Sequence, residues 1–167
     1  MKKLLLAIVI VLSAGAINAQ TNVGHVNSQA LMDTLPSRKV AIEKLLAFEK
    51  AGIEELQEME ADFNMAYQKY ETERPNMSPV IIKIEEEKLM KKQQALQDRE
   101  QSLNSEMQAY SGELNQPILE MVQTAVKNVA ESKKLSYVID ESVTLYFAGG
   151  TDITDAVIKE LLKLDAQ

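Results

Sequence analysis

Two prolines interrupt an otherwise continuous run of helix-forming residues. The stretch 37–116 is rich in Glu, Lys, Gln, Leu, Ala and Met, which all favour helices. Pro75 and Pro79 lie near its middle, and a proline lacks the amide hydrogen and clashes with the preceding helical turn. The segments on either side are about 37 and 35 residues long, roughly 55 and 52 Å as helices. Such matched lengths predict an antiparallel hairpin over 37–116, with its tip at 74–79.

Apolar residues recur along both helical segments. They follow 3/4 spacing before the prolines and a strict spacing of seven after them, and a sustained period of seven is typical of a coiled-coil seam. The predicted seam consists of Leu56, Met59, Phe63, Tyr70, Ile82, Leu89, Leu96, Leu103 and Tyr110. The companion positions of this seam lie four residues further on, at Glu86, Gln93, Glu100, Met107 and Leu114. Because the first three are polar, we expect a narrow seam that becomes more apolar toward Leu114.

The residues flanking the hairpin show the short strand and helix patterns of a compact domain. Val23 and Val26 suggest a short strand, and a helical turn after them should stop at Pro36. Pro117 suits the first turn of a new helix, or a kink, with an apolar face from Ile118 to Val129. The sequence therefore predicts a discontinuous body made of residues 20–36 and 117–167.

Two strands and a terminal helix are expected in the second part of this body. "LSYVIDES" alternates Leu135, Tyr137 and Ile139 on one face, and "VTLYFAGG" predicts a second strand after a turn at residues 140–142. The last helix should begin after a cap at Thr151 or Asp152. The predicted core of the body consists of Val23, Val26, Leu135, Tyr137, Ile139, Leu145 and Phe147.

This body is too small to be stable without help. It has fewer than roughly 70 residues, and chains of that size seldom bury enough apolar surface without disulfides, metals or oligomerisation. The sequence contains no cysteine. We therefore expect the chain to oligomerise, with short strands completing a shared sheet or barrel that leaves no open edges.

Residues 1–19 have the pattern of a secretory signal peptide. Lys2 and Lys3 precede an apolar run, and small residues end at Ala19, where we expect cleavage. The alternative is a retained membrane anchor, but the apolar run is shorter than the roughly 20 residues that a spanning helix needs. The absence of cysteine is compatible with an oxidising compartment.

The charge is strongly acidic. The whole chain has 18 basic and 25 acidic residues, and since Lys2 and Lys3 fall in the leader, the mature chain from Gln20 carries a net charge near −9. This balance gives no electrostatic footprint for nucleic acid or for an anionic membrane.

The sequence predicts neither an enzyme nor a metal or cofactor site. His25 is the only histidine, and no partners of suitable type and spacing are apparent around it. Glu85, Glu86 and Glu87 point in different directions on a helix, which indicates a solvated face. Gly149 and Gly150 precede a helix, but without a lysine or a longer glycine pattern they indicate a simple turn.

Three segments resemble the Skp/OmpH family of periplasmic chaperones. They are "VGHVNSQALMDTLP" near the start, "QTAVKNVAESKKLSYVID" at 123–140 and "DITDAVIKEL" at 152–161. The order of expected elements is also similar: strand, short helix, long hairpin, helix, strands and terminal helix. The hairpin matches only in its length and its coiled-coil composition.

The resemblance implies a fold that is mainly α with a small β body. It implies a homotrimer whose β-barrel-like body carries three helical tentacles around a cavity, and whose function is the ATP-independent holding of unfolded outer-membrane proteins in the periplasm. One feature departs from well-known members, which have strongly basic tentacles. Residues 37–116 carry 11 basic and 16 acidic side chains, a net charge of −5, so we carry over no lipopolysaccharide site and no attraction to membranes.

The hairpin also contains apolar residues outside its narrow seam. Methionine is flexible and polarizable, which suits surfaces that must accept many sequences. The residues that we expect to touch client chains are Met65, Tyr67, Met77, Ile81, Ile84 and Met90. The competing hypothesis is a structural or adaptor coiled-coil protein that bridges fixed partners in the cell envelope.

Overall fold

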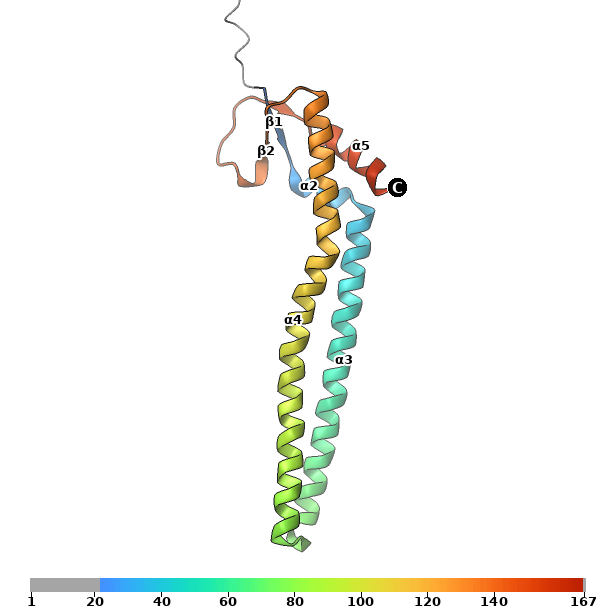
Figure 1. The fold of residues 1–167 in the computed structure, drawn as a ribbon, viewed down its shortest axis with the longest axis vertical. Helices are drawn as coiled ribbons and strands as arrows, with labels where there is room; N and C mark the ends of the chain where they lie inside the picture. The colour runs from blue at the N-terminus through green and yellow to red at the C-terminus, as the bar shows by residue number, and fades with distance from the viewer. Residues whose placement is uncertain (1–21, 167) are drawn as a thin grey trace, which may run out of the picture. The chain divides into compact units, whose positions relative to one another are not determined.

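The computed structural model describes residues 22–166, so the expected signal peptide lies outside the described residues. The elements are β1 (Val23–Val26), α2 (Ser28–Thr34), α3 (Pro36–Glu73), the 3₁₀ turn η2 (Arg74–Asn76), α4 (Pro79–Ser132), β2 (Tyr137–Asp140), the 3₁₀ turn η3 (Glu141–Val143), β3 (Thr151–Asp152) and α5 (Thr154–Asp165) (Figure 1). This confirms a chain that is mainly helical with a small sheet. Within residues 22–166, none of the helices combines the length and hydropathy that crossing a membrane requires.

The chain divides into two compact units. One is the hairpin unit, Ser37–Ile118, and the described part of the other, the body unit, comprises residues 22–36 and 119–166. In the hairpin unit α3 and α4 run antiparallel (Figure 1). The rings of Phe48 and Tyr110 lie 5.2 Å apart, whereas nearer the tip the hydroxyl of Tyr70 donates a 2.7 Å hydrogen bond to Glu86. The long antiparallel hairpin expected from the sequence is therefore present.

The chain reverses in the short segment between the two helices. Pro75 lies in η2, and Pro79 is the first residue of α4, where its missing N–H would lack an intrahelical partner anyway. Met77 has extended backbone angles, and the amide of Ile81 donates to Oγ of Ser78 at 3.4 Å. The two prolines thus end one helix and start the next.

Pro117 does not start a new helix. It lies inside α4, which continues to Ser132. An interior proline removes one backbone hydrogen bond and costs roughly 3 kcal/mol. The buried side chains of Ile118, Ala125 and Val129 on the same helix show that tertiary packing offsets this cost.

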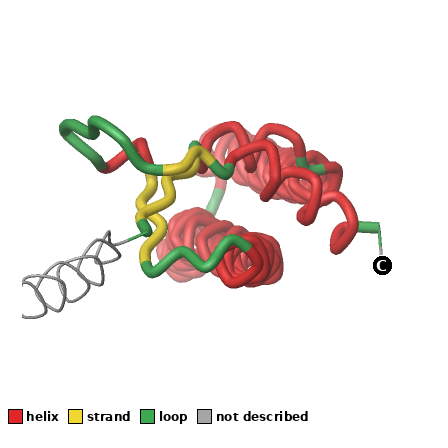
Figure 2. Tube along the Cα trace, turned by 90° about the horizontal axis from the view of Figure 1, so that it is seen from above, coloured by secondary structure: helices red, strands yellow, loops and turns green. Residues whose placement is uncertain are grey.

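The sheet has three parallel strands in the order β2-β1-β3. The strand expected within 143–150 does not form: Asp140 caps η3 by accepting the amide of Ser142 at 3.0 Å, and an irregular segment follows. β3 is formed only at Thr151–Asp152, on the far edge of β1. The intervening residues are needed to carry the chain from one edge of the sheet to the other (Figure 2).

Helices cover one face of this sheet. α2 contacts α5, and the largest fully buried side chains among the described residues are Leu31, Leu35, Ile153, Val157 and Leu161. Gly24 belongs to this covered face, because an added Cβ would lie 2.6 Å from Cδ1 of Leu135. The alternation predicts one face for Leu135, Tyr137 and Ile139, and this prediction is wrong for Leu135, which precedes β2.

Candidate functional site

The predicted seam residues lie in α3 and α4 of the hairpin unit. Tyr70 and Leu103 are buried, and the other seven are half-buried. Gly52 contributes to the same interface from α3. An added Cβ at Gly52 would lie only 2.3 Å from Cδ1 of Leu103, so the absence of a side chain allows the two helices to pack closely there.

The second row of the seam differs from the expected one toward the tip. Glu86, Gln93 and Glu100 are exposed, and the half-buried positions are instead Glu85, Lys92 and Arg99, three residues after each seam residue. Toward the other end Met107 and Leu114 are half-buried, as the four-residue spacing predicted. Long side chains explain the shift, because their aliphatic stems cover apolar neighbours while their charged ends reach solvent.

Ion pairs connect this row to its neighbours. Arg99 lies 2.8 Å from Glu55 of α3 and 3.1 Å from Glu106 of α4, and Lys92 pairs with Asp62 of α3. The hydrogen bond to Glu55, followed by that to Glu106, raises the pKa of Arg99. The Ser102 hydroxyl, followed by Arg99, lowers the pKa of Glu106. Ion pairs therefore join the polar row of the seam to α3 and to neighbouring turns of α4.

Tyr70 closes the seam near the tip. Its hydrogen bond to the carboxylate of Glu86 favours the protonated phenol and raises the pKa of Tyr70. The guanidinium of Arg74 lies 5.7 Å from the centre of the Tyr70 ring. Glu86, which was predicted as a polar companion position of the seam, is exposed and accepts this hydrogen bond from Tyr70.

Most of the residues expected to touch clients are exposed on the hairpin. Met65 and Met90 each expose almost two thirds of their surface, 64% and 65%, and Tyr67, Ile81 and Ile84 are also exposed. Met77 is half-buried at the tip. The part of an apolar side chain that is exposed to water keeps its hydrophobic driving force for later burial.

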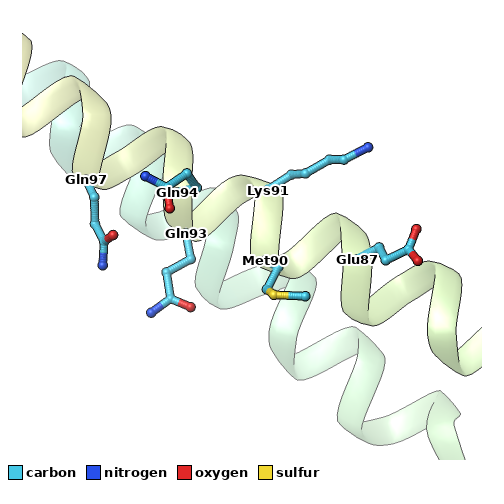
Figure 3. A pocket seen from close by; sticks show the side chains of 6 residues that line it. All are labelled: Glu87, Met90, Lys91, Gln93, Gln94 and Gln97. Atoms are coloured by element: carbon cyan, nitrogen blue, oxygen red, sulfur yellow. The ribbon is translucent and has the colours of Figure 1, made fainter.

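One exposed methionine borders a surface depression. A hollow of about 550 Å³ beside Met90 is lined by Glu87, Lys91, Gln93, Gln94 and Gln97. All come from α4, and Figure 3 shows Met90 and Gln93 on one side of the helix, with Lys91 directed away from them. The depression is shallow and mixed in polarity, so it suits an extended chain better than a small rigid ligand.

Sequence reasoning missed a second apolar row, on α3. Ile42, Leu46 and Ile53 are exposed, and a depression of about 330 Å³ is lined by Leu46, Ile53 and four polar neighbours. Their spacing of four and seven was a usable signal, because it is offset by one residue from the inward row of Ala41, Leu45 and Gly52. Val80, at the start of α4, is also exposed and was also missed.

The predicted body residues separate onto two faces of the sheet. Val26 is buried on the helix-covered face, with Leu135 beside Gly24. Tyr137 and Ile139 are exposed, Val23 is half-buried, and Leu145 and Phe147 lie exposed in the segment between η3 and β3. This uncovered face and segment form an apolar surface of the body unit.

The same side of the sheet brings polar residues together. Nδ1 of His25 lies 2.6 Å from Oε1 of Glu141, and Asp152 completes a group whose ligand atoms lie within 4.8 Å of one another. Sequence reasoning found no partners for His25, because Glu141 follows it by 116 residues and Asp152 lies still further along the chain.

The structure defines a mainly helical protein with a small parallel sheet and a long helical hairpin. The hairpin exposes apolar side chains of methionine, isoleucine and tyrosine. This chain belongs to the family of OmpH-like outer membrane proteins, whose model matches residues 22–161. The family resemblance noted from the sequence is thereby confirmed.

Relatives and a solved structure agree with this membership. The chain is 30% identical to the chaperone protein Skp of Photorhabdus luminescens and 28% identical to that of Escherichia coli K12, in both cases over 96% of this chain and 99% of the relative. A crystal structure of a putative outer membrane chaperone (OmpH-like) from Caulobacter crescentus shares the fold. Its TM-score is 0.75 at 19% identity, covering 89% of this chain and 86% of that one.

Proposed function

We propose that this protein is an ATP-independent periplasmic chaperone that holds unfolded outer-membrane proteins and prevents their aggregation. The observation that carries the proposal is the set of exposed apolar side chains along the hairpin, above all Met65, Ile84 and Met90. Membership in the OmpH-like family and similarity to proteins named chaperone protein Skp support it. The protein acts by binding and needs no catalytic group.

Affinity comes from several weak contacts. Full burial of one such side chain contributes roughly 1.5–3 kcal/mol, and an open helix surface provides less. Micromolar affinity requires about 8 kcal/mol. Several side chains must therefore act on one client, and hairpins from several subunits supply them through high effective concentration.

The proposal includes a homotrimer built on the body unit. The uncovered sheet face presents Tyr137 and Ile139, and the segment after η3 presents Leu145 and Phe147. β2 is an edge strand of a parallel sheet, and parallel sheets are normally buried on both faces. Association of three chains through this surface covers it and leaves the hairpins around a shared cavity.

Light scattering provides the test of client holding. Two unrelated unfolded β-barrel proteins are diluted from denaturant with and without the mature chain, and aggregation should be suppressed for both. A variant with residues 40–113 replaced by a short turn should lose suppression while its mass in solution still corresponds to a trimer. Suppression by that variant contradicts the proposal, and activity toward a single partner only favours the structural adaptor.

A substitution variant tests the surface more finely. Met65, Ile84 and Met90 are changed together to Gln, a good helix former that leaves the hairpin intact. We expect client affinity to fall at least about tenfold, which corresponds to about 1.4 kcal/mol. Leu162→Gln is the matched control, because Leu162 is exposed on α5 of the body unit. Equal effects of the two variants would assign the binding to general surface hydrophobicity.

A further inference from the structure

Three chain segments bring metal-binding side chains to one point of the body unit. His25 lies in the central strand β1, Glu141 begins η3 directly after β2, and Asp152 lies in β3. The parallel register pairs His25 with Asp152, so the two side chains leave the same face of the sheet. Nδ1 of His25 is 2.6 Å from Oε1 of Glu141, and the three ligand atoms lie within 4.8 Å of one another.

We propose that His25, Glu141 and Asp152 form a binding site for a divalent transition-metal ion, with Zn²⁺ as the best-matched probe. One imidazole nitrogen and two carboxylate oxygens form a donor set that zinc accepts in proteins, with water as the fourth ligand. Two carboxylates also balance the charge of a divalent ion. The chain contains no cysteine, so no thiolate competes for such an ion.

Zinc binding requires the side chains to move. Zinc lies about 2.0–2.2 Å from such donors, so the donors of a tetrahedral site are about 3.3–3.6 Å apart. The largest separation in the group, up to 4.8 Å, must therefore shrink by roughly 1 Å or slightly more, and the 2.6 Å separation of His25 and Glu141 must open by a little under about 1 Å. Asp152 is exposed and can make this movement while its Oδ1 accepts the amide of Thr154 at 2.9 Å.

Binding exchanges a proton for the ion. The hydrogen bond between His25 and Glu141 contains one proton, and the metal takes its place between Nδ1 and the carboxylate. That proton moves to Nε2 of His25 or is released to solvent, so the neutral imidazole provides its Nδ1 lone pair to the metal. No redox step or further reactant is required.

The site lies where it can fix an otherwise irregular segment. Glu141 and Asp152 stand at the two ends of the connection between β2 and β3, and Phe147 within it lies 4.8 Å from the His25 ring, centre to centre. A cavity of about 30 Å³ between this segment and the sheet is lined in part by Val23 and Ile139. A bound ion ties both ends of the segment to β1 and thereby orders the apolar side chains that it carries.

Asp152 distinguishes a metal site from a simple ion pair. A hydrogen-bonded His25–Glu141 pair needs no second carboxylate, whereas a three-ligand site depends on it. Asp155→Asn is the matched control, because Asp155 is an exposed carboxylate in the first turn of α5, outside the group.

The experiment uses the untagged mature chain after treatment with a chelator. Zn²⁺ is titrated and followed by calorimetry and by long-range ¹H–¹⁵N spectra of the imidazole, in which His25 gives the only histidine signals. We expect one Zn²⁺ per chain and a change in the Nδ1 resonance. His25→Gln and Asp152→Asn should each weaken binding by at least about 100-fold, whereas Asp155→Asn should leave it unchanged. Mg²⁺, which prefers oxygen ligands, should leave the Nδ1 resonance unchanged.

Two outcomes overturn the proposal. The first is an unchanged Nδ1 resonance at saturating Zn²⁺, which leaves a simple ion pair. The second is binding that His25→Gln and Asp152→Asn leave intact, which places the ion on other acidic residues. Far-UV circular dichroism confirms that each variant is folded, and Glu141→Gln provides a third test of the ligand set if either variant unfolds. Neither outcome affects client holding, which depends on the hairpin.

Discussion

Gly52 provides a sharp test of the packing inside the hairpin. Replacing a glycine in the middle of a helix by alanine normally stabilises the protein. In this structure an added Cβ would lie 2.3 Å and 2.7 Å from the two methyl carbons of Leu103, which is itself buried. Gly112 is the matched control, since it also lies inside a helix but, apart from adjoining residues and the backbone of its own helix, nothing lies within 4 Å of its added Cβ.

The expected magnitudes follow from two opposing effects. The helix preference of alanine over glycine contributes about 1 kcal/mol, whereas overpacking of a filled interface costs roughly 1–3 kcal/mol. Gly112→Ala should therefore raise the free energy of unfolding by up to about 1 kcal/mol. Gly52→Ala should leave it unchanged or lower it by up to about 2 kcal/mol. The difference between the two variants measures the close contact.

Urea unfolding followed by circular dichroism measures these effects. All variants are compared at one protein concentration, because self-association adds to apparent stability. In a Leu103→Ala background the obstruction is removed, so Gly52→Ala should become stabilising, with a coupling energy of about 1–3 kcal/mol. Equal stabilisation by Gly52→Ala and Gly112→Ala, with no coupling to Leu103, would refute the packing described here.

Three further predictions concern the body unit and the ion pairs. Burial raises the pKa of Asp140, but hydrogen bonds from Ser28 and Ser142 outweigh this effect, so the pKa is lowered in the folded protein. The stability that ionised Asp140 contributes should be complete above the pKa of the unfolded chain and should disappear as the pH falls through the lower folded pKa. Asp140→Asn should remove this part of the acid sensitivity in unfolding titrations. Arg99→Met should lower the unfolding temperature in dilute buffer by more than in 1 M NaCl, because salt screens its exposed ion pairs; an identical loss in both would contradict an electrostatic role. Leu161→Ala should reduce the free energy of unfolding by about 2–5 kcal/mol, since the side chain is fully buried, whereas exposed Leu162→Ala should change it by less than about 0.5 kcal/mol in the same urea assay.

Local sequence rules were sufficient for the two helices of the hairpin and the reversal between them. Helix propensity and a proline pair specify two helices and a reversal from residues close together in the chain. The period of seven identified the enclosed residues, from Ile82 to Tyr110, without reference to a partner. The period did not show which second row faces the partner helix, because that depends on the rotation of each helix about its own axis. In the structure the second row consists of Glu85, Lys92 and Arg99.

The body unit shows where local rules fail. "VTLYFAGG" has the residues of a strand, yet the only described strand after η3 is Thr151–Asp152, because the chain must first cross to the free edge of β1. Alternation also suggested one face for Leu135 and Tyr137, although β2 begins only after Leu135. The first error concerns the choice of partner strand and the second the residue at which a strand begins, and both depend on pairing with a distant segment.

The helices, the turn between them and the seam of period seven were therefore predictable, since they follow from interactions within a few residues. The strand order, the ion pairs between α3 and α4 and the meeting of His25 with Glu141 and Asp152 depend instead on how distant segments pack. His25 and Asp152 are 127 positions apart, and the pairing of β1 with β3 brings them together. Periodicity describes which way a side chain faces, but contact between distant segments requires a folded partner.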